Sequence, residues 1–154
     1  ADFEREKSRE NIVNTLNVLL ENNYIPIINE NDTVATDEIQ FGDNDKLAAL
    51  TAALIGADLV IIATNTDGIY TKESINLNSK KTILKVDDLT ALRNEIADGK
   101  SSQGTGGMLS KIEAAEILKN KKIDTWILNG IGDNFMINAI NEKIPFTKIL
   151  NNTE

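Results

Sequence analysis

The sequence contains neither cysteine nor histidine. Without cysteine there is no disulfide and no thiolate-held metal, and this composition favours a cytoplasmic setting. Without histidine, a Ser-His or Cys-His nucleophile and a histidine-bound zinc are excluded as well. Any chemistry in this chain must therefore come from carboxylates, lysines, side-chain amides, hydroxyls and backbone amides.

Basic residues are few compared with acidic ones. The chain has 16 Lys and Arg against 24 Asp and Glu, which gives a net charge of −8. Nucleic acids and anionic membranes bind basic surfaces, so the sequence argues against both as partners. No apolar run approaches the length of a membrane span. With 41% hydrophobic and 26% charged residues, the composition is that of an ordinary globular domain.

Helical patterns and apolar runs alternate along the chain. We predict helices over residues 3–22, 44–56, 87–98, 108–120 and 133–141, and strands over 24–29, 58–64, 83–86, 123–129 and 146–150. The run "DLVIIAT" (58–64) is continuously apolar, as a parallel strand covered on both faces should be. The alternation predicts an α/β fold with a mainly parallel sheet between helical layers. No change in composition marks a linker, so one domain is expected over 1–154.

Polar segments follow three of the predicted strands, at 29–32, 64–67 and 129–130. Ligands of parallel sheets gather at the carboxyl ends of the strands, so we expect these segments at one edge. Each has an ordinary explanation too, because Asn and Asp favour turns. The same holds for "GDND" at the start of the helix expected at 44–56, where acids can cap the helix.

The stretch "GTGGMLSK" (104–111) places three glycines and Lys111 at the start of a predicted helix. It is not a Walker phosphate loop, because no glycine precedes the lysine. Free amides at a helix N-terminus favour an anion, and a lysine one turn later supplies a positive charge to phosphate oxygens. A flexible loop followed by a solvated lysine would give the same spacing, so both interpretations stay open at this point.

Taken in order, "IINENDTV", "FGDNDKLAALTAALIGADLVIIAT", "DGIY" and "GTGGMLSKIEAA" resemble the amino acid kinase family, and within it the glutamate 5-kinases. The resemblance runs from residue 1 to about 130 and implies an αβα three-layer sandwich. It further implies transfer of the γ-phosphoryl group of ATP to the side-chain carboxylate of L-glutamate. The product, L-glutamyl 5-phosphate, begins proline biosynthesis, with proline as feedback inhibitor. A carboxylate nucleophile is ionised at neutral pH, so no histidine base is required.

The resemblance also implies roles for particular residues. Lys111 would stabilise the migrating phosphoryl group, and Asp45 would hold Lys111 in place. Asn29, Asp32 and Asn44 would bind glutamate. Nucleotide binding would fall to Thr64, Asn65, Thr105, Gly106, Gly107, Met108, Leu109, Ser110 and Lys111, although Asn65 stands where the family usually has Asp. Mg²⁺ would arrive with the phosphates of ATP and would not be held by a protein cage.

The resemblance does not include the family's N-terminal part. That part carries a further phosphate-binding lysine and a glycine loop. We therefore expect the C-terminal portion of one kinase domain, with no additional C-terminal domain, that does not turn over alone. Family members suggest a homo-oligomer, either a dimer or a tetramer. Two alternatives stay open: a sibling kinase acting on aspartate, acetylglutamate, carbamate or UMP, and a non-catalytic nucleotide- or amino-acid-binding regulatory module.

Overall fold

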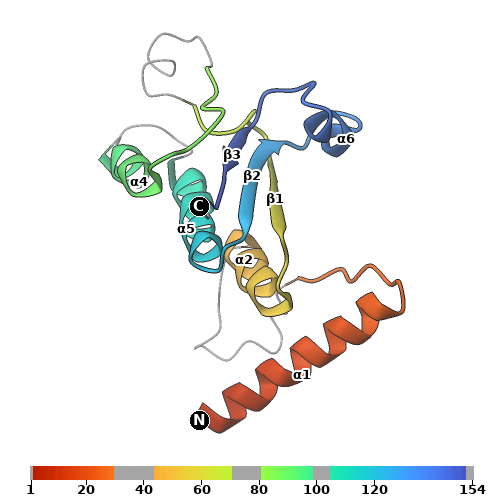
Figure 1. Ribbon diagram of the computed structural model, residues 1–154. Helices are drawn as coiled ribbons and strands as arrows, with labels where there is room; N and C mark the ends of the chain where they lie inside the picture. The colour runs from red at the N-terminus through yellow and green to blue at the C-terminus, as the bar shows by residue number, and fades with distance from the viewer. Residues whose placement is uncertain (1, 30–43, 71–80, 99–104, 152–154) are drawn as a thin grey trace.

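A computed structural model describes residues 2–29, 44–70, 81–98 and 105–151 (Figure 1). In these ranges the predicted alternation of helices and strands is found. The elements in chain order are α1 (Asp2–Glu21), α2 (Asn44–Ile55), β1 (Leu59–Thr64), α4 (Leu89–Asp98), α5 (Thr105–Asn120), β2 (Asp124–Asn129), α6 (Phe135–Ile140) and β3 (Thr147–Ile149). Within these ranges, no helix combines the length and the hydropathy that a membrane span would need.

The described sheet has three strands in the order β1-β2-β3. β1 and β2 run parallel, with Leu59 opposite Asp124 and Thr64 opposite Asn129. β3 runs antiparallel to β2, so the described sheet is mixed. Because β1 and β2 end in register, the segments that follow them leave the sheet at the same edge, as the sequence predicted.

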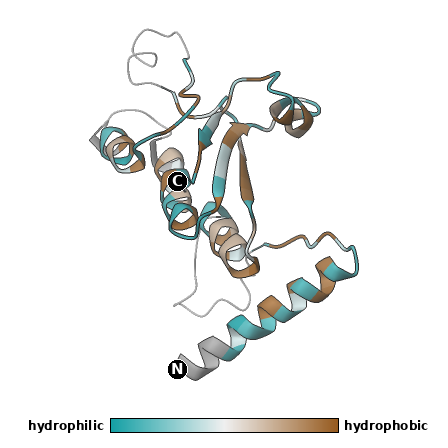
Figure 2. Cartoon of the chain, in the orientation of Figure 1, coloured by the Kyte–Doolittle hydropathy of each residue, from teal (hydrophilic) through white to brown (hydrophobic). Residues whose placement is uncertain are grey.

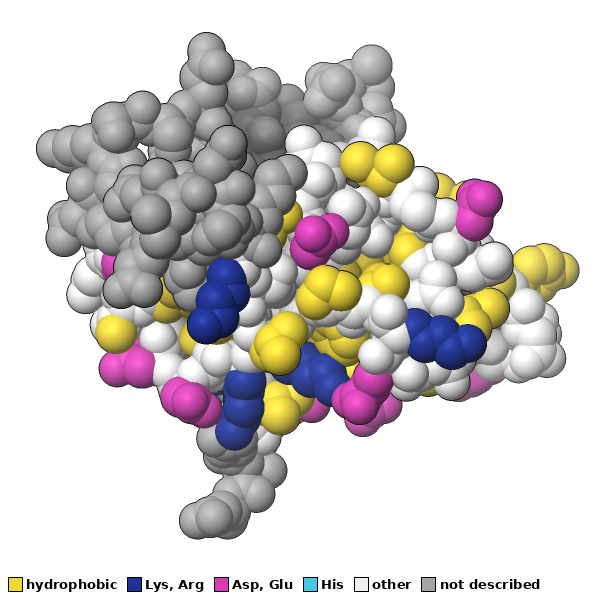
Figure 3. All heavy atoms as spheres, turned by 90° about the horizontal axis from the view of Figure 1, so that it is seen from above, with side chains coloured by type: hydrophobic (Ala, Val, Ile, Leu, Met, Phe, Trp, Pro, Cys, Tyr) yellow, Lys and Arg dark blue, Asp and Glu magenta, His cyan; other side chains and the backbone are white. Residues whose placement is uncertain are grey.

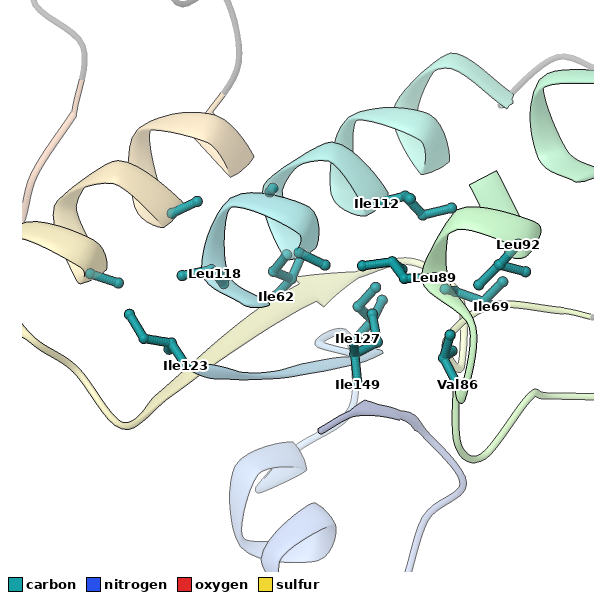
Figure 4. Packing of buried hydrophobic residues seen from close by; sticks show 14 residues of the cluster. Ile62, Ile69, Val86, Leu89, Leu92, Ile112, Leu118, Ile123, Ile127 and Ile149 are labelled. Atoms are coloured by element: carbon teal, nitrogen blue, oxygen red, sulfur yellow. The ribbon is translucent and has the colours of Figure 1, made fainter. Parts of the chain in front are cut away.

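Helices cover both faces of this sheet, which confirms the α/β fold in three layers. Side chains of α2, α4 and α5 pack on one face around Ile62, Ile112 and Ile127, and the last two are fully buried (Figure 4). On the other face, Ala139 of α6 packs with Leu128 and Phe146. Burial of each large aliphatic side chain contributes about 1.5–3 kcal/mol to folding stability. These contacts therefore hold the helices against the two faces of the sheet.

Local groups explain where α4 begins and α2 ends; α4 begins two residues later than predicted. Asp88 caps α4, because its Oδ1 accepts a hydrogen bond from the backbone N–H of Ala91 at 2.9 Å. Gly56 follows the last residue of α2 with a φ of +65°, the left-handed conformation that commonly ends helices at glycine. α2 therefore begins and ends where the sequence placed it, to within a residue.

The prediction of a strand at 24–29 is wrong. The segment is irregular, and the side chains of Ile25 and Ile27 are 90% and 97% exposed. A strand requires a neighbour with which to form a ladder, and no described strand pairs with this segment. In Figure 2 its hydrophobic residues lie on the connection that follows α1.

The strand expected at 83–86 is only partly formed. The backbone N–H of Lys148 donates to Leu84 O at 2.8 Å, and the N–H of Val86 donates to Lys148 O at 3.0 Å. These bonds make an isolated bridge between Lys85 and Lys148, which is too short to count as a strand. The segment nevertheless lies beside β3.

Candidate functional site

An ion pair joins the first turn of α2 to the second turn of α5, between residues that lie far apart in the sequence. Lys111 Nζ donates a hydrogen bond to Asp45 Oδ2 at 2.7 Å. The two side chains are only 15% and 19% exposed. Ser110 Oγ donates to the same carboxylate oxygen at 3.3 Å. Charge-assisted hydrogen bonds of this length are strong, so Asp45 fixes the direction of the lysine ammonium.

Local sequence explains how these residues reach one another. Asp45 lies in the first turn of α2, where a carboxylate is favoured by the helix dipole. Lys111 lies in the second turn of α5, one residue after Ser110. α2 and α5 both pack on the same face of the sheet through small side chains such as Ala49 and Ala115, which are fully buried. Small residues let the two helices approach closely enough for the pair to form.

α5 begins earlier than predicted. The glycines led us to expect a loop up to residue 107, but the helix starts at Thr105 and includes Gly106 and Gly107. Glycine in a helix costs about 1 kcal/mol relative to alanine, which is why the pattern favoured a loop. A Cβ at Gly107 would meet no atom of the described chain within 4 Å, so no contact among the described residues requires glycine there.

The remaining predicted nucleotide residues lie in two places. On α5, Met108 is half-buried and packs against the core, and Leu109 is half-buried too. At the carboxyl end of β1, Thr64 is half-buried and Asn65 is exposed, with Thr64 Oγ1 3.5 Å from Asn65 Oδ1. Figure 3 views the molecule from the side where β1 and β2 end: acidic, basic and apolar side chains are interspersed there.

Two of the three predicted glutamate residues lie within the described ranges. Asn44 opens α2 and is exposed directly beside Asp45 in the sequence. Asn29 is exposed in the irregular segment after α1. Asp32 lies outside the described residues. The structure therefore brings Lys111, Asp45 and Ser110 together, with Asn44 beside Asp45 in the sequence. Glutamate binding by Asn29, Asp32 and Asn44 stays a prediction.

The sequence predicted that 64–67 and 129–130 share an edge, but it missed a specific contact between them. Asn129 Nδ2 donates to Asp67 Oδ1 at 3.1 Å. The backbone N–H of Gly130 donates to Thr64 O at 2.9 Å. The only signal in the sequence was that both side chains follow apolar strands. In the described ranges, no group of three or more acidic side chains could hold a metal ion.

An α/β sheet with an anchored lysine beside a helix N-terminus is typical of phosphate-binding domains. Comparison with known proteins agrees with this class. The model of the amino acid kinase family matches residues 1–129, and the chain belongs to this family.

Two curated relatives and one solved structure show how far the similarity extends. The chain is 38% identical over 144 residues to a glutamate 5-kinase of Clostridium perfringens, covering 90% of this chain and 54% of the relative. It is 45% identical over 148 residues to a glutamate 5-kinase of Caldanaerobacter subterraneus, covering 95% of this chain and 40% of the relative. The chain thus spans about half or less of these relatives. The fold is similar to a UMP kinase of Ureaplasma parvum, with a TM-score of 0.63 and 19% identity over 90% of this chain and 52% of that one.

Proposed function

We propose that the protein containing this chain is an ATP-dependent kinase that phosphorylates the side-chain carboxylate of L-glutamate. The product would be L-glutamyl 5-phosphate, at the first step of proline biosynthesis. The observation that carries the proposal is the ion pair between Lys111 and Asp45, at 2.7 Å beside the start of α5. The names of the two curated relatives support glutamate as the acceptor.

The proposed chemistry needs charge neutralisation more than proton transfer. The carboxylate of glutamate is already ionised at neutral pH, so no general base has to activate it. Phosphoryl transfer depends on positioning and on cations that balance the charge of the phosphate oxygens. Lys111 carries three N–H donors, of which one is directed at Asp45. The others can meet phosphate oxygens while Asp45 holds the ammonium in one direction.

The start of α5 adds a second source of positive potential. The first N–H groups of a helix have no partner within it, and the helix dipole favours an anion there. No described atom lies within 4 Å of a Cβ built at Gly107, so the described part of the chain leaves the backbone there open to a ligand. We therefore assign the ATP phosphates to the backbone of 105–110 and to Lys111. Mg²⁺ bound to these phosphates would neutralise part of their charge.

The other parts of the proposal rest on the family resemblance. Thr64 and Asn65 would contact the nucleotide at the carboxyl end of β1. Asn44, Asn29 and Asp32 would bind the ammonium and carboxylate groups of glutamate. Proline as feedback inhibitor, a homo-oligomeric assembly and a cytoplasmic location belong to the same proposal.

The acceptor can be tested with the intact protein that contains these residues. ADP formation from MgATP would be measured with L-glutamate and, in parallel, with aspartate, N-acetylglutamate, carbamate and UMP. The proposal expects turnover with glutamate that exceeds turnover with each of the others. Faster turnover with one of the other acceptors would make this a sibling kinase. Nucleotide binding without turnover on any acceptor would indicate a regulatory module.

A further inference from the structure

Besides the backbone bond from Gly130 to Thr64, the side chain of Asn129 joins the segments that follow β1 and β2. Its Nδ2 donates to Asp67 Oδ1 at 3.1 Å, and its Oδ1 accepts from the backbone N–H of Ile131 at 3.0 Å. One carboxamide thus contacts the turn after β1 with its nitrogen and the turn after β2 with its oxygen. Both of its ends are used, so its orientation is fixed.

Asp67 is in turn oriented from its other side. Tyr70 Oη donates to Asp67 Oδ2 at 3.4 Å, and the backbone N–H of Asp67 donates to Tyr70 Oη at 3.2 Å. The aspartate is half-buried. Its two carboxylate oxygens are therefore directed at Asn129 and at Tyr70, which is the arrangement of a residue that holds other groups in place.

The same turn is also pressed against β3. Gly68 has a φ of +128°, and a Cβ there would lie 2.5 Å from Thr147 Oγ1. The backbone N–H of Ile69 donates to that hydroxyl at 2.8 Å, and Thr147 is fully buried. The turn from 65 to 70 is therefore attached to β3 at its far end and to Asn129 through Asp67.

We propose that Asp67 is a positioning residue for the nucleotide site, acting through Asn129. The inference rests on the proposed function, in which Thr64 and Asn65 contact ATP from the beginning of this turn. A ligand at the carboxyl edge of a parallel sheet lies across the segments of neighbouring strands. Strand pairing sets the spacing of the two strand ends. The bond between Asp67 and Asn129 fixes how the turn after β1 lies against the end of β2, and hence the fit of the nucleoside part of ATP.

The first test is Asp67→Ala in the intact protein. Loss of one hydrogen bond at a ligand site is expected to raise the KM for ATP about five- to tenfold. The kcat and the KM for glutamate should stay within about twofold, because the phosphate-binding residues are untouched. Asp124→Ala is the matched control: its Oδ1 accepts from the backbone N–H of Asn151 at 2.7 Å, at the opposite end of β2. This variant loses a similar bond and should leave the KM for ATP unchanged.

The second test exchanges the two partners. Asn129→Asp places two carboxylates against each other and should raise the KM for ATP at least as much as Asp67→Ala does. Adding Asp67→Asn reverses the direction of the hydrogen bond and should restore the KM to near the wild-type value. This test compares Asn129→Asp with the double variant and does not use Asp67→Ala. It therefore remains decisive if Asp67→Ala fails to fold.

The outcomes separate this inference from the proposed function. An unchanged KM for ATP in Asp67→Ala, or a double variant no better than Asn129→Asp, overturns the positioning role while leaving the kinase assignment intact. A wild-type protein without ATP-dependent turnover overturns the proposed function, and the nucleotide role of Asp67 with it. A raised KM that the double variant restores supports both.

Discussion

Two ion pairs in the described chain have the same length and very different surroundings. Lys111–Asp45 and Lys148–Glu142 both have N–O distances of 2.7 Å. The first pair lies between two helices, with side chains 15% and 19% exposed. The second lies on the surface, with side chains 30% and 74% exposed. Lys148 also lies over the rings of Trp126 and Phe146, at 5.7 and 5.0 Å from their centres.

The comparison shows that solvent exposure, and not the N–O distance, decides how much an ion pair contributes to folding stability. Water and salt screen a pair at the surface, so its net effect on folding is small. A partly buried pair is screened less, and removing one partner leaves the other charge poorly solvated. Lys111 is thus held in one orientation near the start of α5, while the ammonium group of Lys148 lies over the rings of Trp126 and Phe146.

The larger stability effect is expected at the buried pair. Asp45→Ala should lower the free energy of unfolding by about 1–3 kcal/mol, because the half-buried ammonium of Lys111 loses its partner. Urea unfolding would measure the change. Glu142→Ala, made in the same way at the exposed pair, should give a clearly smaller loss. If Glu142→Ala were as destabilising as Asp45→Ala, the contrast between the two pairs would be wrong.

The smallest effect is a pH dependence at the exposed pair. The hydrogen bond and the charge of Lys148 hold the pKa of Glu142 below its ordinary value of 4.5. The unfolded chain therefore takes up this proton first as the pH falls. The stabilisation is present above the ordinary pKa and is lost as the pH falls through the lower, folded value. Thermal unfolding of wild type and Glu142→Gln would be measured from about pH 3 to about pH 6, a range that spans the ordinary pKa of a glutamate. The two curves of melting temperature against pH should converge at low pH. Parallel curves would contradict the assignment.

The sequence could predict most helices and strands because each has a local signal. The structure shows local groups at two helix ends, the cap Asp88 and the left-handed Gly56, and the continuous apolar run at 58–64 predicted β1. The run at 24–29 carried an equally clear local signal, yet it forms no strand. Pairing depends on a neighbouring strand, and hydrophobic pattern contains no information about that neighbour.

The site was predictable in part for similar reasons. Family resemblance placed Asp45 beside Lys111, although 66 positions separate them. It did not reveal that α5 begins at Thr105, because glycines locally favour a loop. The edge argument placed the segments after β1 and β2 together, but the bond between Asp67 and Asn129 depends on side-chain direction. Such a direction follows from packing, which single-sequence patterns do not encode.

The most direct test of the central claim compares the two lysines of these pairs in the intact protein. The account predicts that Lys111→Ala lowers the kcat for glutamate-dependent ADP formation about 100-fold or more, since a preorganised charge at the phosphoryl group is lost. Lys148→Ala should leave kcat unchanged, and so should Lys119→Ala at the exposed end of the same helix. Near-normal kcat in a folded Lys111→Ala protein would contradict the assignment of phosphate binding to α5.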